Sequence, residues 1–523
     1  MKKTLRILSL VLVLVMMVSA LAACGGEKKP AETKKPSSGN NNSGDVFDEK
    51  WADVNFDGTE IILQLNNWEP TSVINAGASN SIKYIKGPDD YTTDAVQNAV
   101  FDRNNRVINK LGLDVKYNED TYSSGGGLPA VENFVLADLE DSPDVMQVPG
   151  YSMLRAGIKG LLYNALTDDE DNYFDITEEN GWYADLMLDN TLDESKVFVL
   201  AGDYFIDILR CAYSVFVNID MYEELFASEG GVETLYQTVN DGDWTYDELM
   251  RLADVAYVDR GTAGSVDEVD TFGVAAGAWW YYRTFFSTSG LDIFEETADG
   301  KIAYVQDVSE IHTFVDKLVE MLSHDSFLNP HAYANNDQGP YEVTKLFTSG
   351  GTLFALDQFV LNLEGTNIRS MSQKVGVVPF PKYNKDTEYG ALVSDNANFG
   401  GILYNSDKFT EASALLQMLC EESNKGKGSV IYEYYDVTLK YKYSADAGQI
   451  QMLETIRNGL CSPKSFTYDN YFSQDIAGVS TYGSVIKKST NSGTNTFASD
   501  WASQVGAVQQ ALEDTYKIYG LQD

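Results

Sequence analysis

Histidine and cysteine are both scarce in this chain, and each shortage narrows what the protein can do. Three histidines and four cysteines occur among 523 residues. Few histidines leave few side chains that act as general bases or zinc ligands near neutral pH. Few cysteines leave no basis for a disulfide scaffold. Histidine-based catalysis and a fold held by disulfides are therefore both unexpected.

Basic residues are in short supply as well. The chain has 38 Lys and Arg against 78 Asp and Glu, which gives a formal net charge of −40. A chain of this charge repels phosphate backbones and broad anionic lipid surfaces. We expect no nucleic-acid partner, and anionic ligands only where a local basic pocket exists.

Motifs for nucleotides and metals are missing or incomplete. No P-loop, GxGxxG, GxSxG or HExxH occurs in a suitable context. His324, Asp325 and His331 lie close together, but their spacing fits no zinc motif. The segment 53–58 matches the start of a calcium loop, but Gln64 stands where the loop needs Glu and a strand pattern follows. We expect a plain turn there, no metal and no cofactor.

The N-terminus has the pattern of an export signal. Lys2, Lys3 and Arg6 precede an apolar run at 7–18, and small residues lead to Cys24. The ending "LAAC" resembles the bacterial lipobox, in which the cysteine is acylated after cleavage just before it. We predict a signal peptide at 1–23 and lipidation of Cys24; the alternative is a secreted protein with an incidental cysteine.

Residues 24–48 are rich in Gly, Ser, Asn, Lys and Pro, which is typical of a flexible tether. We expect the chain to be anchored by lipid at the extracellular face of the cell membrane. After Cys24, three cysteines remain: Cys211, Cys420 and Cys461. One bridge among them and free buried thiols are both open.

The rest of the chain alternates strand and helix patterns. A turn at Asp57-Gly58 precedes a strand at 61–65, and a helix beginning at 95 stops at Gly112 before a strand at 113–117. A strand ending near 148 precedes another helix. Thr245 and Glu248 form a capping box, and an apolar stripe predicts a helix around 412–419. This alternation predicts an α/β protein with mixed, mostly parallel sheets.

Seven segments occur in an order that resembles a known family. They are "LGLDVKY", "SPDVMQV", "DILRCAYSVFVNIDMYEEL", "DWTYDELMRLADV", "GGTLFALDQFV", "VGVVPFPKYN" and "TEASALLQML". Together they resemble the extracellular solute-binding proteins of bacterial ABC importers, the family that includes maltose-binding protein. The resemblance covers about Gly58 to Lys517, and 168–182 is a candidate insertion.

The resemblance implies a two-lobed clamshell that binds its ligand between the lobes. It places crossing segments in 201–218 and near 375–384. Lobe one would hold 49–206 and 379–428, and lobe two 207–378 and 429–523. It also implies a monomer without enzymatic activity that delivers a carbohydrate, an oligosaccharide in our interpretation, to ABC permease subunits.

Candidate ligand residues follow from the resemblance together with the chemistry of sugars, which favours aromatic platforms beside planar polar groups. The cluster "AGAWWYYRTFF" supplies Trp279, Trp280 and Tyr281, and its alternative role is to fill the core. The other candidates are Trp68 with Asn67 and Glu69, Tyr151, Arg210, Asp357, Gln358, Asn396, Asn398 and Tyr471. For Arg210 the alternative is a pair with an acidic residue.

Two other functions remain open. A surface glycoside hydrolase would need two carboxyls roughly 5–10 Å apart, and the sequence has many acidic residues. The same fold with a peptide or polyamine ligand is the second alternative.

Overall fold

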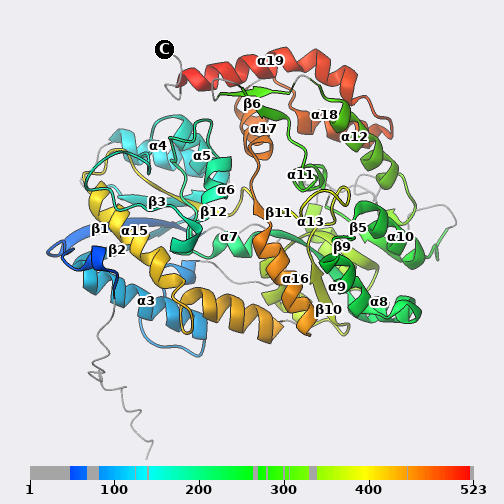
Figure 1. The fold of residues 1–523 in the computed structure, drawn as a ribbon, viewed down its shortest axis with the longest axis horizontal. Coiled ribbons are helices and arrows are strands. Elements are labelled where there is room, and N and C mark those ends of the chain that lie inside the picture. The colour runs from blue at the N-terminus through cyan, green and yellow to red at the C-terminus, as the bar shows by residue number, and fades with distance from the viewer. Residues whose placement is uncertain are drawn as a thin grey trace, which may run out of the picture. The chain divides into compact units, whose positions relative to one another are not determined.

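The computed structural model describes residues 47–67, 82–123, 125–137, 141–262, 269–277, 281–297, 301–305, 307–328, 339–443, 446–476 and 478–518. The chain divides into two units, 1–54 and 55–523. In the first unit the described residues form the short 3-10 helix η1 (Glu49–Trp51). The predicted signal peptide, Cys24 and nearly all of the predicted tether lie outside the described residues. The fold that follows is that of the second unit (Figure 1).

The first of two main sheets has the strand order β12-β3-β1-β2. Its strands are β1 (Thr59–Asn66), β2 (Leu113–Asp120), β3 (Val145–Pro149) and β12 (Asn398–Ile402). β1 pairs in parallel with β2 and β3, and β12 is antiparallel to β3. From Ile61 onward every residue of β1 is buried, as expected for an inner strand covered on both faces. β2 is an edge strand and alternates buried or half-buried with exposed residues before its exposed end.

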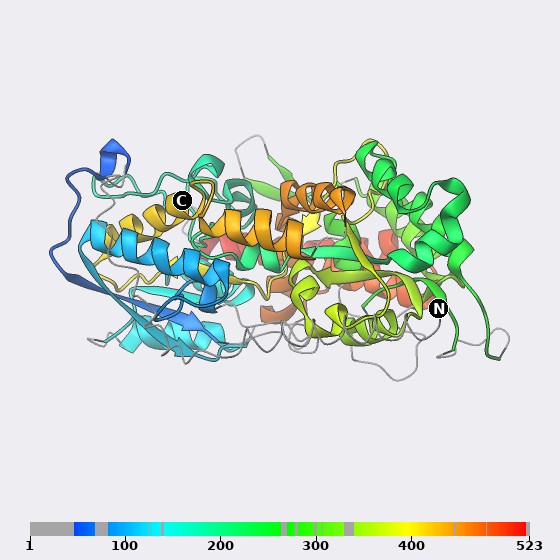
Figure 2. The same cartoon turned by 90° about the horizontal axis from the view of Figure 1, so that it is seen from below.

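Helices cover both faces of the first sheet. α3 (Ala95–Leu111) and α15 (Phe409–Ser423) pack against each other and against β2 and β1, while α4 (Gly127–Ala137) and α5 (Gly150–Ile158) contact β3 (Figures 1 and 2). The Asp94 side chain caps the first turn of α3, and Gly112 ends the helix at φ 61°, a conformation that favours glycine. The predicted helix, stop and strand at 95–117 are confirmed.

The second main sheet has the strand order β10-β4-β9-β5-β8. Its strands are β4 (Tyr213–Asn218), β5 (Phe272–Ala275), β8 (Phe327–Leu328), β9 (Thr352–Phe359) and β10 (Val375–Val378). β5 is parallel to β8 and β9, whereas β4 is antiparallel to β9 and β10. Small ladders join β6 (Phe294–Glu296) to β7 (Ile302–Tyr304) and β11 (Ala391–Leu392) to β13 (Leu460–Cys461). The predicted mixed α/β fold is confirmed.

A second set of helices packs on the second sheet and on its neighbours. These helices are α8 (Ile219–Phe226), α9 (Val232–Asn240), α10 (Tyr246–Ala256), α11 (Tyr281–Ser287), α12 (Ser309–Leu322), α13 (Gly339–Thr348) and α16 (Ala447–Asn458). The Thr245 side chain caps α10 by accepting from the Glu248 backbone N–H at 3.4 Å, which confirms the predicted start of this helix. α17 (Lys464–Asp475), α18 (Tyr482–Ser492) and α19 (Phe497–Ile518) attach through α11 and α12, and α17 also contacts α5.

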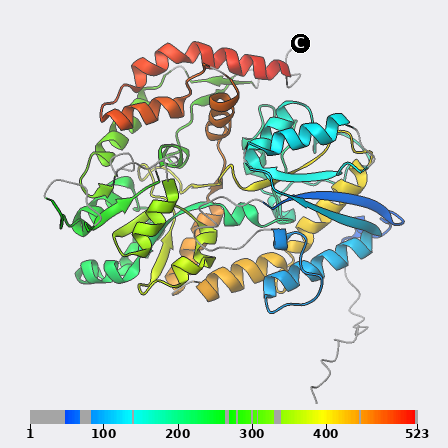
Figure 3. The ribbon, with the colours of Figure 1, turned by 180° about the vertical axis from the view of Figure 1, so that it is seen from behind.

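The chain crosses between the sheets more than once (Figure 3). Leu200 still bridges to Gly400 in β12, whereas β4 belongs to the second sheet, so the first crossing runs through α7 (Asp207–Arg210). The chain returns between β10 and β12. The exact lobe limits, 49–206 with 379–428 and 207–378 with 429–523, stay a proposal.

The remaining described elements are short or lie in the connections between the two sheets. They are the 3-10 helices η2 (Ile82–Tyr84), η3 (Glu178–Asn180), η4 (Ala227–Glu229) and η5 (Val360–Glu364), the helices α6 (Ala184–Asp189) and α14 (Thr366–Arg369), and the π-helix η6 (Tyr432–Tyr443). Cys211, Cys420 and Cys461 are not joined by a disulfide in the described structure, which favours thiols over a bridge.

Candidate ligand-binding site

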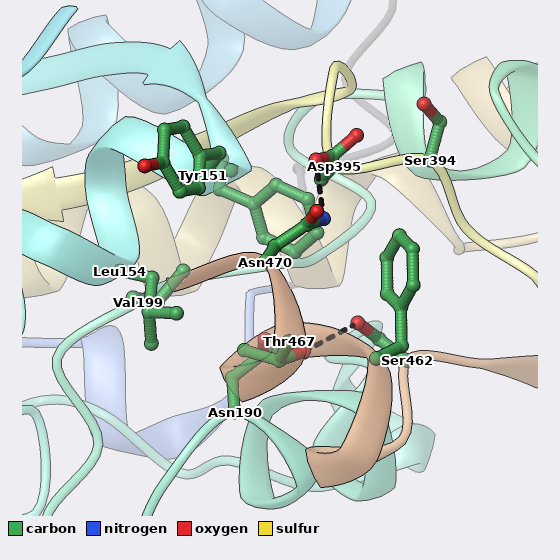
Figure 4. A pocket seen from close by; sticks show the side chains of 12 residues that line it. Tyr151, Leu154, Asn190, Val199, Ser394, Asp395, Ser462, Thr467 and Asn470 are labelled. Atoms are coloured by element: carbon green, nitrogen blue, oxygen red, sulfur yellow. Dashed lines mark hydrogen bonds between the residues drawn. The ribbon is translucent and has the colours of Figure 1, made fainter. Parts of the chain in front are cut away.

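A small cavity lies between α5, β12 and α17. One wall consists of α5, which follows β3, together with Phe399 of β12. α17 forms the opposite wall (Figure 4). The lining residues are Gly150, Tyr151, Leu154, Asn190, Val199, Ser394, Asp395, Phe399, Ser462, Phe466, Thr467 and Asn470. Aromatic rings and planar polar groups therefore meet at one place, as a sugar site requires.

The turn from β3 into α5 brings the first wall close to β12. Gly150 begins α5, and a Cβ at this position would meet Phe399 Cδ2 at 2.6 Å. A side chain there would have to displace the Phe399 ring. Glycine at 150 thus permits the close approach that places Tyr151 at the cavity.

α17 presents three lining residues from successive turns. Phe466, Thr467 and Asn470 are spaced so that they share one face of the helix. Thr467 donates to Asn190 Oδ1 at 3.0 Å, and the Asn470 amide donates to Asp395 Oδ2 at 2.6 Å. Asn470 is 1% exposed, and within the described part of the chain its Oδ1 has no hydrogen-bond partner. This oxygen is therefore an acceptor that a ligand hydroxyl can satisfy.

Asp395 is the carboxylate among the lining residues. Burial raises the pKa of its carboxyl to about 6, although the Arg283 guanidinium acts to lower it. Arg283 is itself buried and forms an ion pair with Asp469 Oδ2 at 3.3 Å. The cavity therefore holds a carboxyl that changes charge at mildly acidic pH.

The pKa of Asp395 makes stability depend on pH in a defined direction. The unfolded carboxyl ionises near 3.8 and the folded one near 6, so this group favours the folded state below pH 4 and that contribution is lost as the pH rises through 6. Asp395→Asn keeps the side chain neutral. We expect the stability of this variant, relative to wild type, to increase by about 1–3 kcal/mol between pH 4 and pH 7.

Urea unfolding followed by circular dichroism at both pH values measures this difference. The exposed Asp386→Asn variant is the matched control and should follow wild type. A stability difference between Asp395→Asn and wild type that does not change with pH would contradict the assignment.

α5 and α17 also contact each other at the edge of the cavity. The Tyr151 hydroxyl donates to Asp475 Oδ2 at 2.6 Å, and Arg155 forms an ion pair with the same carboxylate. Burial and the Asp475 contact raise the pKa of Tyr151, so its hydroxyl stays protonated as a donor. In this arrangement the cavity volume is about 20 Å³, which is room for about one water molecule. A sugar enters only if α5 and α17 move apart or the lining side chains rearrange.

Of the residues predicted from sequence, Tyr151 lines the cavity. Tyr471, on α17, is half-buried beside Phe472, with ring centroids 5.4 Å apart. Asn398 is buried next to Phe399; it accepts from the Asn66 amide at 2.8 Å and donates to Asp207 at 3.2 Å. Asn396 donates to Asp395 at 3.3 Å. Each of these three positions is next in sequence to a lining residue, and their contact with a ligand remains a prediction.

Arg210 has the environment of a buried structural ion. It is 0% exposed and pairs with Asp207 and Glu364, at 3.4 Å in each case. Its guanidinium also lies over the Tyr84 ring, 4.8 Å from the centroid. Of the two roles expected for Arg210, these contacts match the pair with acidic residues.

Tyr281 lies in α11 and is fully buried, with its hydroxyl 2.8 Å from Thr490 Oγ1. Asn67 follows β1 and is exposed. Asp357 and Gln358 belong to β9, where Gln358 pairs with Ser214. Trp68, Glu69, Trp279 and Trp280 lie outside the described residues. The ligand roles of these positions also remain predictions.

The structure adds lining residues that sequence reasoning did not select, above all Asp395, Asn470, Asn190 and Thr467. Three of them lie within four residues of predicted positions: Asp395 precedes Asn396, and Thr467 and Asn470 precede Tyr471. Polar side chains directly before a buried strand, or between aromatics on one helix, were the available signal.

The residues whose spacing was compared with metal motifs make other contacts. His324 Nδ1 lies 3.0 Å from Asp254 Oδ1, and His331 is outside the described residues. Asn55 Oδ1 accepts from the Asp57 backbone N–H at 2.9 Å in the turn before β1. Within the described ranges no group of three or more His, Cys, Asp or Glu is placed to hold a metal ion. In the same ranges, no helix has both the length and the apolar character of a membrane span.

No family model matches the sequence, and no curated protein matches it. Among solved structures, the chain is similar to a cyclo/maltodextrin-binding protein complexed with maltotetraose, with a TM-score of 0.50 and 15% identity over 88% of this chain and 97% of that one. It is also similar to the galacto-N-biose-/lacto-N-biose I-binding protein of the ABC transporter from Bifidobacterium longum, with a TM-score of 0.51 and 14% identity over 90% and 99%. The chain thus has the two-lobed fold of these solute-binding proteins.

Proposed function

We propose that this chain is a lipid-anchored solute-binding protein that captures an oligosaccharide outside the cell and delivers it to an ABC importer. The observation that carries the proposal is the cavity between α5 and α17, where Tyr151 and Phe466 stand beside Asp395 and Asn470. The two solved structures reported above, which have this fold, are both sugar-binding proteins by name. Cys24 would supply the anchor and permease subunits the docking partner.

The mechanism that we propose consists of binding and closure. Carboxylate and amide groups bind sugar hydroxyls, and rings pack on the apolar C–H faces. Bringing α5 and α17 together around the ligand excludes water, which strengthens each hydrogen bond. The contacts of Asp475 with Tyr151 and Arg155 then join the two walls.

The glycoside-hydrolase alternative has less support. A retaining or inverting hydrolase needs two carboxyls on either side of the scissile bond. Among the residues that line this cavity in the described structure, Asp395 is the one acidic side chain. We therefore propose that the protein has no hydrolytic activity, and any product released from an oligosaccharide on prolonged incubation would contradict this.

Tryptophan fluorescence tests the proposed ligand class. Residues 47–523 are titrated with a panel of mono- and oligosaccharides, and one of these sugars is expected to give a saturable quench or spectral shift. If the aromatic cluster is a platform, Trp279→Ala or Trp280→Ala abolishes the response, since a stacked ring contributes about 2–4 kcal/mol at a binding hot spot.

The matched control is Trp244→Phe. Trp244 is 0% exposed and packs in the core against Phe354, so this change should leave affinity unaltered. Binding that survives both cluster substitutions would move the platform role to Trp68. No response to any sugar, together with saturable binding of a peptide or a polyamine, would overturn the carbohydrate proposal and leave the fold in place.

A further inference from the structure

A second and larger cavity lies elsewhere along the contact between α6 and β13. Its volume is about 410 Å³, within the range of roughly 300–1,000 Å³ that is typical of small-ligand pockets. Leu186 and Leu460 line this cavity. Asn190 and Ser462, a few residues further on in the same two segments, line the cavity between α5 and α17. The two cavities are therefore separate sites that border the same two segments, 186–190 and 460–462.

The walls of the second cavity come from distant parts of the chain. Residues of the segment 178–186 form one side, and Asp203, the end of α15 at Asn424 and the end of α16 complete it. The segment 178–186 overlaps the insertion expected at 168–182. A hydrogen bond to α15 holds the segment 178–186 in place: Trp182 Nε1 donates to Gln417 Oε1 at 2.8 Å.

The acidic lining groups occupy different depths. Asp203 is 2% exposed and accepts from the Tyr183 hydroxyl at 2.7 Å through Oδ1. Glu178 and Asp185 also line the cavity but are exposed, so they stand at its open side. A cationic ligand group thus finds one carboxylate inside and two near the entrance.

Arg457 supplies the opposite charge. It is half-buried at the end of α16, and its guanidinium lies over the Tyr435 ring, 4.9 Å from the centroid. This stacking fixes the plane of the guanidinium and leaves its N–H groups for another partner. Within the described residues Arg457 forms no ion pair, although Asp203 and Glu178 line the same cavity.

We propose that the second cavity binds a basic α-amino acid. The ligand carboxylate would accept two hydrogen bonds from Arg457, the geometry in which a guanidinium binds a carboxylate most strongly. Its ammonium groups would bind Asp203 inside the cavity and Glu178 at the entrance, with Asp185 adding negative charge there. Three carboxylates and one guanidinium match a ligand with two positive charges and one negative charge.

Isothermal titration of the full-length chain in a mild detergent with L-lysine tests the proposal, in the absence of any sugar. We expect saturable binding of L-lysine. L-norleucine lacks the side-chain ammonium and 1,5-diaminopentane lacks the carboxylate, so each should bind at least about tenfold more weakly. Equal binding of 1,5-diaminopentane would overturn the role of Arg457, and absence of saturable L-lysine binding would overturn the site.

Two variants locate the site. Arg457→Gln and Glu178→Gln should each weaken L-lysine binding at least about tenfold, and Glu178 is exposed, so its variant is expected to fold. Glu194→Gln, an exposed position in the same part of the chain that does not line the cavity, is the matched control. L-lysine binding that is unchanged in both variants would place the ligand elsewhere. Sugar binding is measured in a separate experiment, by tryptophan fluorescence. Absence of sugar binding would overturn the proposed function and would leave the L-lysine result unaffected.

Discussion

Replacing Arg210 by methionine is expected to lower the free energy of unfolding by about 3–5 kcal/mol. The guanidinium is 0% exposed and neutralises Asp207 and Glu364 within the first crossing between the two sheets. Glu364 would keep the Tyr434 hydroxyl, which donates to it at 2.9 Å, but would remain a buried charge without a cation. Urea unfolding of residues 47–523, followed by circular dichroism, measures the change.

The comparison variant is Arg251→Met. Arg251 also pairs with two glutamates, Glu229 and Glu248, but on the surface, and its loss should change stability by less than about 1 kcal/mol. Adding Glu364→Gln to Arg210→Met should recover part of the loss, because it removes the uncompensated charge. A loss for Arg210→Met as small as for Arg251→Met would show that the buried pairs contribute little, and a larger loss in sugar affinity than in stability would restore the ligand role.

Asn470→Ala is expected to weaken binding of the sugar identified by fluorescence roughly 30- to 1,000-fold, a loss of about 2–4 kcal/mol. Asn470 lines the cavity, its Oδ1 has no hydrogen-bond partner in the described structure, and its amide donates to Asp395 at 2.6 Å. The substitution removes both an acceptor for the ligand and the donor that positions a second ligand group. Fluorescence titration of the variant measures the loss.

Asn240→Ala provides the matched control. Asn240 is exposed at the end of α9, where it donates to Gln451 at 3.0 Å, and its loss should leave sugar affinity within twofold. Thermal unfolding of both variants separates a local effect on binding from global destabilisation. Unchanged affinity in Asn470→Ala would show that the sugar binds outside this cavity and would leave Trp68 and the cluster at 279–281 as the remaining candidates.

Local patterns in the sequence were sufficient to predict several of the helices and strands. The apolar run in β1, the stop at Gly112 and the box from Thr245 to Glu248 are each set by neighbours within a few residues, and each appears where the pattern placed it. Chain-local physics decides such features, so a single sequence contains them. The two-lobed fold, by contrast, was implied by the resemblance of seven segments to a known family.

The site depends on pairs that are distant in sequence. Asp395 meets Asn470 across 75 residues, and Tyr151 meets Asp475 across 324 residues. No periodicity reports such pairs, and the same holds for the burial of Arg210. The charge of Arg210 was visible in the sequence, but its partner Glu364 lies 154 residues away. Only the packed fold decides between a ligand contact and a structural pair.

The exposed edge of the first sheet bears on how this protein behaves where many copies of it are close together. β2 ends its sheet with the sequence LDVKYNED, in which Lys116 contacts Asp114 and the last three residues are exposed and polar or acidic. An edge strand with unpaired backbone groups is a template for strands of neighbouring molecules, and charged side chains oppose that association. Where copies of this chain lie side by side, as the proposed lipid anchor would place them, the charged residues would make them repel one another at this edge, which opposes aggregation through their sheets.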